Sequence, residues 1–270
     1  MSRAAVLGSP IAHSLSPVLH GAAYSALGLT GWRFEALECA EAELPGVLAA
    51  RPDWAGFACT MPLKRAVLQV ATTVSEPAAA IGAGNTLLPG ATGWHADNTD
   101  WIGIRDALAA AGAGPPGRVV LLGAGGTAQA ALAALPAGCE ITALVREPGR
   151  AGALLAAADR LGRPVRLGRL GEPVPADLVI ATLPAGAADP LAATVPDWTM
   201  PPGWTLLDVV YAGWPTPLAR AARQAGARLV SGAAMLLFQA ARQVELMTGR
   251  AAPVEAMRAA MRAAAPASGC

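Results

Sequence analysis

Lys64 is the only lysine in this sequence, and its chemistry makes it the first candidate for a catalytic group. The sequence contains 20 lysine and arginine residues, so every other side chain of this kind is an arginine. A guanidinium stays protonated at all physiological pH values, whereas an amine can gain or lose a proton when its surroundings change. We therefore interpret Lys64 as a candidate proton donor, with an ordinary surface lysine as the alternative.

Asp100, in the segment HADNTDWIG, is the carboxylate that we pair with Lys64. Aspartate and asparagine in such turns usually cap helices or fold the loop, and the same holds for Asn85 in GAGNTLL. Taken together, however, Lys64 and Asp100 can move a proton, with the amine as general acid and base and the carboxylate orienting it and balancing its charge. We predict that they form the catalytic pair.

Ser14 and Ser16 lie two residues apart in the segment AHSLSPVLHG. In an extended segment, side chains at this spacing point to the same side. Pro17 then favours a helix start, with Ser16 as its N-cap. Two hydroxyls beside a helix N-terminus suit a carboxylate, and the alternative is an N-cap without a binding role.

The segment RVVLLGAGGTAQAALAAL predicts a strand, a glycine turn and a helix, which is the context of a dinucleotide-binding fingerprint. Gly123 would make the turn, and Gly125 would let a pyrophosphate approach the backbone. Ala128 is the third small position. Gly126 and Thr127 would present N–H groups at the helix start, where the helix dipole favours negative charge.

The end of the next strand predicts which dinucleotide binds, because the residue about 20 positions after the first glycine contacts the adenosine ribose. Val145 stands there in place of an acidic residue, and Arg146 follows it. Arg146 and Arg150 could hold a 2′-phosphate, which indicates NADP. Glu147 would place a negative charge near that phosphate, so NAD stays possible.

Short apolar runs alternate with alanine-rich helical stretches, which predicts an α/β fold with mostly parallel sheets. The segment AGAGPPG, residues 111–117, is a strong helix breaker that we interpret as a domain junction. Strands are expected at residues 4–7, 32–37, 56–59, 118–122, 141–145, 177–182, 205–210 and 228–230.

The composition excludes several classes of partner. A net charge of +1 argues against nucleic acid, and no apolar stretch of membrane-spanning length occurs. The beginning of the chain lacks a signal-peptide pattern, and the four cysteines have neither zinc-site nor disulfide-framework spacing. We expect a cytoplasmic protein with a small-molecule partner, no metal site, no nucleic-acid partner and no membrane contact.

Seven blocks in order make the chain similar to the shikimate dehydrogenase family: GSPIAHSLSP, TMPLK, GAGNTL, DNTD, GAGGTA, DVVYAGWPTPLA and SGAAMLLFQA. The resemblance implies an N-terminal α/β substrate-binding domain, residues 1–101 completed by 233–270. It also implies a Rossmann-like NADP-binding domain with a parallel sheet, residues 102–232. The implied activity is the reversible, NADPH-dependent reduction of 3-dehydroshikimate to shikimate in the pathway to chorismate and the aromatic amino acids.

The resemblance also implies roles for individual residues. Lys64 and Asp100 match the family's catalytic pair. Tyr211, implied near the substrate, could equally be a tyrosine packed at a strand end. The substrate would be held by Ser14, Ser16, Thr60, Lys64, Asn85, Asp100, Tyr211 and Gln239. NADP would contact Gly123, Ala124, Gly125, Gly126, Thr127, Arg146, Val209 and Gly232, and we expect a monomer or a homodimer.

Two departures from the family pattern keep alternatives open. Ala58 stands where the family usually has asparagine, and Glu147 follows the arginine where the family usually has threonine. A quinate/shikimate or aminoshikimate dehydrogenase that uses NAD or NADP is therefore the alternative enzyme. A non-catalytic dinucleotide sensor is a distant alternative, because the chain keeps both Lys64 and Asp100.

Overall fold

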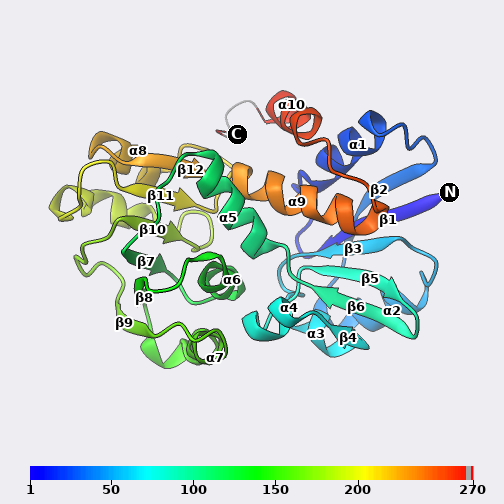
Figure 1. Ribbon diagram of the computed structural model, residues 1–270, viewed down its shortest axis with the longest axis horizontal. Helices are drawn as coiled ribbons and strands as arrows, with labels where there is room; N and C mark the ends of the chain where they lie inside the picture. Colours follow the sequence, from blue (N-terminus) through cyan, green and yellow to red (C-terminus); the bar gives the residue numbers. More distant parts are fainter. Residues whose placement is uncertain (266–268, 270) are drawn as a thin grey trace. The chain divides into compact units, whose positions relative to one another are not determined.

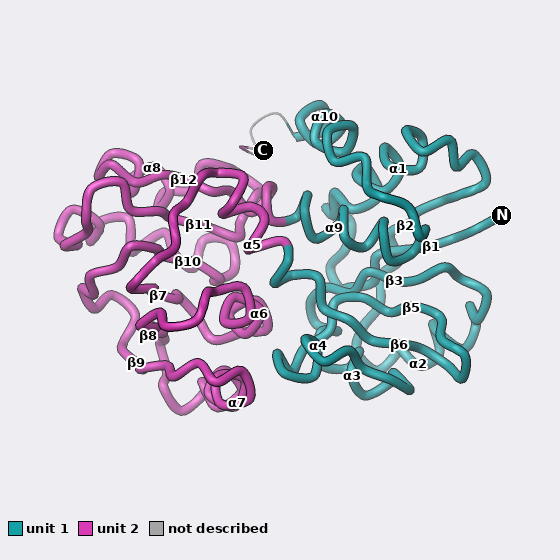
Figure 2. Tube along the Cα trace, viewed as in Figure 1, with its two compact units in different colours: residues 1–102, 236–265 teal, residues 103–235, 266–270 magenta. Residues whose placement is uncertain are grey.

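The computed structural model describes residues 1–265 and 269, which form two compact units (Figure 2). Unit 1 contains residues 1–102 and 236–265, and unit 2 contains residues 103–235 together with Gly269. The chain passes between the units inside α5 (Asp100–Ala110) and inside α9 (Gly232–Thr248). The boundaries expected from the sequence lie after residues 101 and 232. The breaker at 111–117 is a loop within unit 2 that connects α5 to β7, so it is not a junction.

Unit 1 is built on a six-stranded mixed sheet with the order β2-β1-β3-β5-β6-β4 (Figure 1). Strand β1 is parallel to β2 and β3, whereas β5 is antiparallel to β3 and β6. Consequently β1, β3 and β6 point in the same direction. The strands are β1 (Ser2–Gly8), β2 (Trp32–Glu38), β3 (Gly56–Cys59), β4 (Thr73–Val74), β5 (Thr86–Gly90) and β6 (Gly93–Asp97).

The central strands β1 and β3 are buried on both faces of this sheet, and their residues are therefore apolar at successive positions. On one face, Leu7 of β1 and Phe57 of β3 belong to one apolar cluster. Val6 and Ala58 belong to a separate cluster, which Phe34 of β2 extends. The other helices of the unit are α1 (Ser16–Ala26), α2 (Leu44–Ala49), α3 (Ala66–Val70), α4 (Glu76–Ile81) and α10 (Val254–Ala264).

Unit 2 contains a six-stranded sheet with the order β12-β11-β10-β7-β8-β9, in which every pair of neighbours is parallel. This is the strand order of a dinucleotide-binding fold, and it reverses between β7 and β10. The α/β class with mostly parallel sheets is thereby confirmed. The elements are β7 (Arg118–Leu122), α6 (Gly126–Ala134), β8 (Glu140–Val145), α7 (Gly152–Arg160), β9 (Val165–Arg169), β10 (Leu178–Ala181), β11 (Thr205–Asp208), α8 (Pro217–Gln224) and β12 (Arg228–Ser231).

The N-terminus of α1 differs from the expectation. Leu15, not Ser16, is the N-cap, and its own side chain makes no capping hydrogen bond. The preceding residues form a turn, in which the Ser14 N–H donates to the Ile11 carbonyl (3.0 Å). Pro17 lies in the first turn, as expected. The turn replaces the extended segment because the Ser14 hydroxyl accepts a hydrogen bond from the Ser16 N–H (3.3 Å), which brings the backbone back on itself.

Among the described residues, no helix is long and apolar enough to cross a membrane, and no three His, Cys, Asp or Glu side chains cluster as metal ligands would. Cys39 and Cys59 are buried free thiols, and Cys139 is a partly exposed one. Cys270 lies outside the described residues, so the expected absence of a disulfide framework is not tested at that position.

His20 makes the stability of unit 1 dependent on pH. It lies on α1, fully buried and stacked on Phe34, and burial lowers its pKa from 6.5 to about 3. The unfolded chain binds a proton at this histidine below pH 6.5, whereas the folded chain does so only near pH 3. The free energy of unfolding should therefore fall as the pH drops through this window, by up to about 1.4 kcal/mol per pH unit from this group.

Denaturant unfolding at several pH values between about 7 and 4 checks this prediction. A His20→Gln variant serves as reference, because it keeps all the carboxylates that also titrate in this range. We expect the wild-type curve to fall more steeply than the variant curve. Parallel curves would show that His20 does not contribute.

Candidate active site

The candidate site of unit 1 lies at one edge of its sheet. Because β1, β3 and β6 run in the same direction, their carboxyl ends meet at this edge, and the antiparallel β5 begins there. Backbone hydrogen bonds tie the loops after β1 and β3 together: Thr60 N–H donates to the Leu7 carbonyl (2.9 Å) and Ser9 N–H to the Met61 carbonyl (3.0 Å). The topology therefore brings together segments that are far apart in the sequence.

Lys64 and Asp100 form an ion pair at this edge, with Lys64 Nζ donating to Asp100 Oδ2 at 2.6 Å. The lysine side chain is 21% exposed and the aspartate side chain 6%. Asp100 is the first residue of α5, where the helix dipole stabilises a negative charge, and its N–H donates to Asn98 Oδ1 (2.9 Å). The start of α5 thus stabilises the charge of the carboxylate, while the lysine side chain keeps partial access to solvent.

Asn85 and Gln239 join this pair. Asn85 Nδ2 donates to Asp100 Oδ1 (2.8 Å) and to Gln239 Oε1 (3.2 Å). The Thr99 N–H donates to Asn85 Oδ1 (2.7 Å), which fixes the orientation of this amide because a backbone N–H can only donate. Four of the predicted site residues, Lys64, Asn85, Asp100 and Gln239, are therefore one hydrogen-bonded cluster.

The other predicted substrate residues of unit 1 lie in the loops at the same edge. Ser14 is half-buried in the turn after β1, and Ser16 is buried at the start of α1. Thr60 directly follows β3, four residues before Lys64. Tyr211, by contrast, lies in unit 2, in the loop after β11, where burial raises its pKa.

The glycine turn of unit 2 follows β7, next to the reversal of strand order. Gly123 has a φ of +109°, which L side chains rarely adopt, and a Cβ there would lie 2.9 Å from Thr182 Oγ1. Gly125 is the N-cap of α6 and has no side chain to cover the helix start. A glycine turn with a positive φ that leads into an uncovered helix N-terminus fits the phosphates of a dinucleotide.

Charged residues follow β8 at the position expected to contact the ribose. Val145 is the last residue of the strand, and Arg146 and Glu147 come directly after it, both exposed. Glu147 pairs with Arg150 at 3.7 Å, with exposed fractions of 66% and 79%. The negative charge of Glu147, which would disfavour NADP, is therefore balanced in part by the positive charge of Arg150.

The predicted cofactor residues Val209 and Gly232 are in direct contact. A Cβ on Gly232 would overlap the peptide carbon and oxygen of Val209. The loop that begins with Val209 is held by Asp208, whose buried carboxylate accepts hydrogen bonds from the Thr216 hydroxyl (2.7 Å) and the Val210 N–H (3.1 Å). Only glycine at position 232 lets the two backbones approach this closely.

Comparisons with known proteins agree with this architecture. The family model described as shikimate dehydrogenase substrate binding domain matches residues 6–87, and the model described as shikimate 5′-dehydrogenase C-terminal domain matches residues 232–262. The shikimate dehydrogenase (NADP(+)) of Moorella thermoacetica is 38% identical over 98% of this chain and 94% of its own length. The chain belongs to the shikimate dehydrogenase family.

Solved structures of this family share the fold. The crystal structure of Mycobacterium tuberculosis shikimate dehydrogenase has 42% sequence identity and a TM-score of 0.86, and the match covers 98% of this chain and 100% of that one. The shikimate 5-dehydrogenase of Thermus thermophilus in complex with NADP(H) and shikimate has 35% identity, a TM-score of 0.86 and the same coverage. The resemblance inferred from the seven sequence blocks is confirmed.

Gly232 allows a sharp structural test within this family fold. In a Gly232→Ala variant, the new methyl group must push the Val209 backbone away, since neither partner is a flexible side chain. We expect the free energy of unfolding to fall by about 1–3 kcal/mol. Denaturant unfolding measures this loss, and Gly152→Ala is the matched control because nothing lies within 4 Å of a Cβ at that position. Equal stability of the two variants would contradict the prediction.

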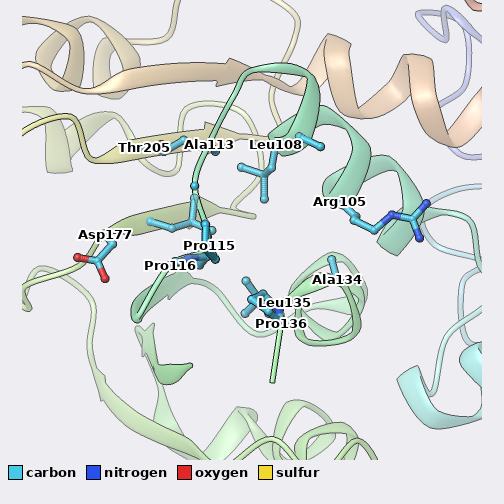
Figure 3. Close-up of a pocket in the computed structure, with 13 residues that line it drawn as sticks. Arg105, Leu108, Ala113, Pro115, Pro116, Ala134, Leu135, Pro136, Asp177 and Thr205 are labelled. Atoms are coloured by element: carbon cyan, nitrogen blue, oxygen red, sulfur yellow. The ribbon is translucent and has the colours of Figure 1, made fainter. Parts of the chain in front are cut away.

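A pocket elsewhere in unit 2 is not the dinucleotide site of this family member (Figure 3). It is lined mainly by leucine, alanine and proline, and it lies where β10 and β11 begin, at Leu178 and Thr205. Figure 3 shows the charged ends of Arg105 and Asp177 directed away from the other lining side chains. Parallel sheets of this kind bind ligands at the opposite, carboxyl ends of the strands.

Several buried polar residues of the site were not predicted from the sequence. Thr99 and Thr86 hold Asn85, and Gln243 donates to the Asn85 carbonyl (3.1 Å) and to Thr86 Oγ1 (3.0 Å). A signal for Gln243 was available, because it follows Gln239 by four residues on α9 and so lies on the same helix face.

Proposed function

We propose that the protein is an NADP-dependent shikimate dehydrogenase that reversibly reduces 3-dehydroshikimate to shikimate. The observation that carries this proposal is the Lys64–Asp100 ion pair of 2.6 Å, held by Asn85 in a chain of this family. The proposed enzyme acts in the cytoplasm, in the pathway to chorismate and the aromatic amino acids. We infer a monomer or a homodimer without a nucleic-acid or membrane partner.

Unit 1 is the proposed substrate-binding unit. Ser14 and Ser16 would hold the substrate carboxylate, since both hydroxyls lie beside the N-terminus of α1. Thr60, Asn85, Asp100, Gln239 and, from unit 2, Tyr211 would contact the ring hydroxyls. The hydrogen bonds that already join Asn85, Asp100 and Gln239 support this assignment, because they orient these groups before a ligand binds.

The proposed proton transfer uses Lys64. As negative charge develops on the ketone oxygen during reduction, the ammonium group donates a proton to that oxygen, and in the oxidation of shikimate the amine takes the proton back. Asp100 orients the amine and balances its charge. Asp100 Oδ1 stays bound to Asn85, so the carboxylate cannot swing away when Lys64 changes its protonation state.

Unit 2 is the proposed NADP-binding unit. The backbone from Gly123 to Thr127, including Ala124, would hold the pyrophosphate, and Arg146 and Arg150 the 2′-phosphate, while Val209 and Gly232 would line the rest of the site. When bound, NADPH supplies the hydride. The glycine turn at Gly123 and the exposed arginines after β8 support this assignment.

Arg146 should determine the preference for NADPH. An Arg146→Gln variant loses a charge-assisted hydrogen bond, so we expect its affinity for NADPH to fall about 10–100-fold. NADH lacks the 2′-phosphate, so its affinity should stay within about twofold. Glu147→Gln is the matched variant. Its affinity for NADPH should rise, because it removes a negative charge from the same turn. Fluorescence titration with both nucleotides measures these values, and equal losses for NADPH and NADH would contradict the assignment.

An assay of the purified protein tests the proposed function. It uses 3-dehydroshikimate, shikimate and quinate, each with NADP and NAD in the matching redox state. We expect the highest kcat/KM for 3-dehydroshikimate with NADPH. A marked preference for quinate with NAD would instead support the alternative dehydrogenase, for which Ala58, buried at the end of β3, is the motivating departure. Nucleotide binding without turnover would favour the sensor.

A further inference from the structure

Unit 1 contains buried polar side chains that have no part in the proposed mechanism, near the residues that hold the Lys64–Asp100 ion pair. His20 and Tyr24 on α1, Gln243 on α9 and Thr86 on β5 all belong to unit 1, and each is at most 3% exposed. Two of their atoms, His20 Nε2 and Gln243 Oε1, are buried without a hydrogen-bond partner. An unsatisfied buried polar atom is costly, so this arrangement needs an explanation.

The orientation of the Gln243 amide follows from its partners. Its Nε2 atom donates to the Asn85 carbonyl (3.1 Å) and to Thr86 Oγ1 (3.0 Å). A carbonyl can only accept, so the nitrogen must face Asn85, and the oxygen is left to accept from another donor. Gln243 is also the side chain whose contact with His20 raises the pKa of this histidine, against the larger, lowering effect of burial.

The His20 ring can supply that donor in only one of its neutral forms. With the proton on Nε2, the ring would present a donor to Gln243 Oε1, and Nδ1 could accept from the Tyr24 hydroxyl, which lies 3.4 Å away. With the proton on Nδ1, both Nε2 and Gln243 Oε1 would be acceptors facing each other. Only the first form satisfies both atoms.

We propose that His20 and Gln243 are positioning residues of the dehydrogenase. They lie in a directional chain of hydrogen bonds that runs from Tyr24 through His20, Gln243, Thr86 and Asn85 to Asp100. The later steps are in place, since the Thr86 hydroxyl donates to Asn85 Oδ1 (2.9 Å) and Asn85 Nδ2 donates to Asp100 Oδ1 (2.8 Å). The chain holds the carboxylate that orients Lys64, and this inference rests on the proposed function.

A purely structural role for His20 makes a different prediction. The ring is stacked on Phe34, with centroids 3.7 Å apart and planes 16° from parallel, so it also fills the core. If packing were its only role, substitutions would lower stability without a specific effect on turnover. Variants that keep or remove the donor at this position separate the two roles.

Steady-state kinetics with 3-dehydroshikimate and NADPH, together with thermal unfolding, test the proposal on the full chain. His20→Leu removes the donor, and we expect kcat to fall about tenfold while the affinity for NADPH is unchanged. His20→Gln places an amide N–H near the former Nε2 and should restore kcat to within about threefold of wild type. Val244→Ala is the control, because it loosens the packing of α9 beside Gln243 and should lower the midpoint of unfolding without lowering kcat.

A double variant tests whether His20 and Gln243 act together. Gln243→Leu should lower kcat about as much as His20→Leu, and the double variant should lose little more, because both changes break the same chain. If the double variant showed the product of the two single losses in kcat, the proposal would be overturned. A wild-type kcat in His20→Leu would also overturn it, and so would equal losses of kcat in His20→Leu and His20→Gln.

The protonated ring nitrogen gives a readout that does not depend on activity. Nitrogen-15 spectra of the 3 histidines, assigned with the His20→Gln variant, should show His20 as a neutral ring with its proton on Nε2. A proton on Nδ1 would overturn the hydrogen-bond chain. A wild-type protein that fails to reduce 3-dehydroshikimate would overturn the proposed function. The spectra would still show whether the proton of His20 lies on Nε2, as the chain of hydrogen bonds requires.

Discussion

Replacing Lys64 by alanine should lower kcat by a factor of about 10²–10⁴, or about 3–5 kcal/mol in the transition state. The amine is the only group in the cluster that can give up a proton to the ketone oxygen, because Asn85 and Gln239 are amides and Asp100 is its counter-ion. Lys64→Arg should be impaired to a similar degree. It keeps the positive charge, but a guanidinium does not release its proton.

Stopped-flow single-turnover rates and NADPH titrations measure this effect separately from binding. The affinity for NADPH should not change, since the residues assigned to the nucleotide belong to unit 2 and Lys64 belongs to unit 1. Arg65→Ala is the matched control, because Arg65 is the adjacent basic residue and is exposed. An alanine variant that keeps more than a tenth of the wild-type rate would rule out Lys64 as the acid.

Replacing Asp100 by asparagine, whose side chain has nearly the same size, should lower kcat by about 10²-fold. The variant removes the charge that faces Lys64 Nζ at 2.6 Å. The new amide also has to face both the Lys64 amine and the Asn85 amide, and an amide can satisfy only one of these two donors with its oxygen. The lysine then loses its fixed orientation.

The double variant with Lys64→Ala distinguishes a joint role from two separate ones. If the carboxylate acts through the amine, the double variant should be no slower than Lys64→Ala by more than about threefold. Asp106→Asn is the control on the same helix, where the carboxylate pairs with Arg105 at 2.6 Å near the surface. Full additivity of the two losses would show that Asp100 contributes independently of Lys64.

Five of the six strands of unit 2, all except β9, could be predicted because they follow a simple rule. Those that fill the middle of a parallel sheet are buried on both faces and therefore read as short apolar runs, as in RVVLL at β7. The glycine turn after β7 was predictable for a similar reason, because a positive φ such as that of Gly123 strongly favours glycine at that position.

The strands that were not predicted from the sequence lack such runs. β5 (Thr86–Gly90) ends in proline and glycine, β6 (Gly93–Asp97) carries histidine and aspartate, and β9 (Val165–Arg169) is only partly buried. β4 has two residues. Their pairing is decided by neighbouring strands, and a single sequence does not contain that information.

The sequence alone determined the residue types that can perform the chemistry, the α/β class and the family, because these depend on local patterns and on ordered blocks. Only the tertiary structure decided that Lys64, Asn85, Asp100 and Gln239 meet, since an antiparallel β5 inserted between parallel strands brings its first residues to the same sheet edge. It also decided that Gln243 supports Asn85 from 158 residues away. Hydrogen bonds over such separations depend on how the chain folds back, and residue type and spacing do not specify that.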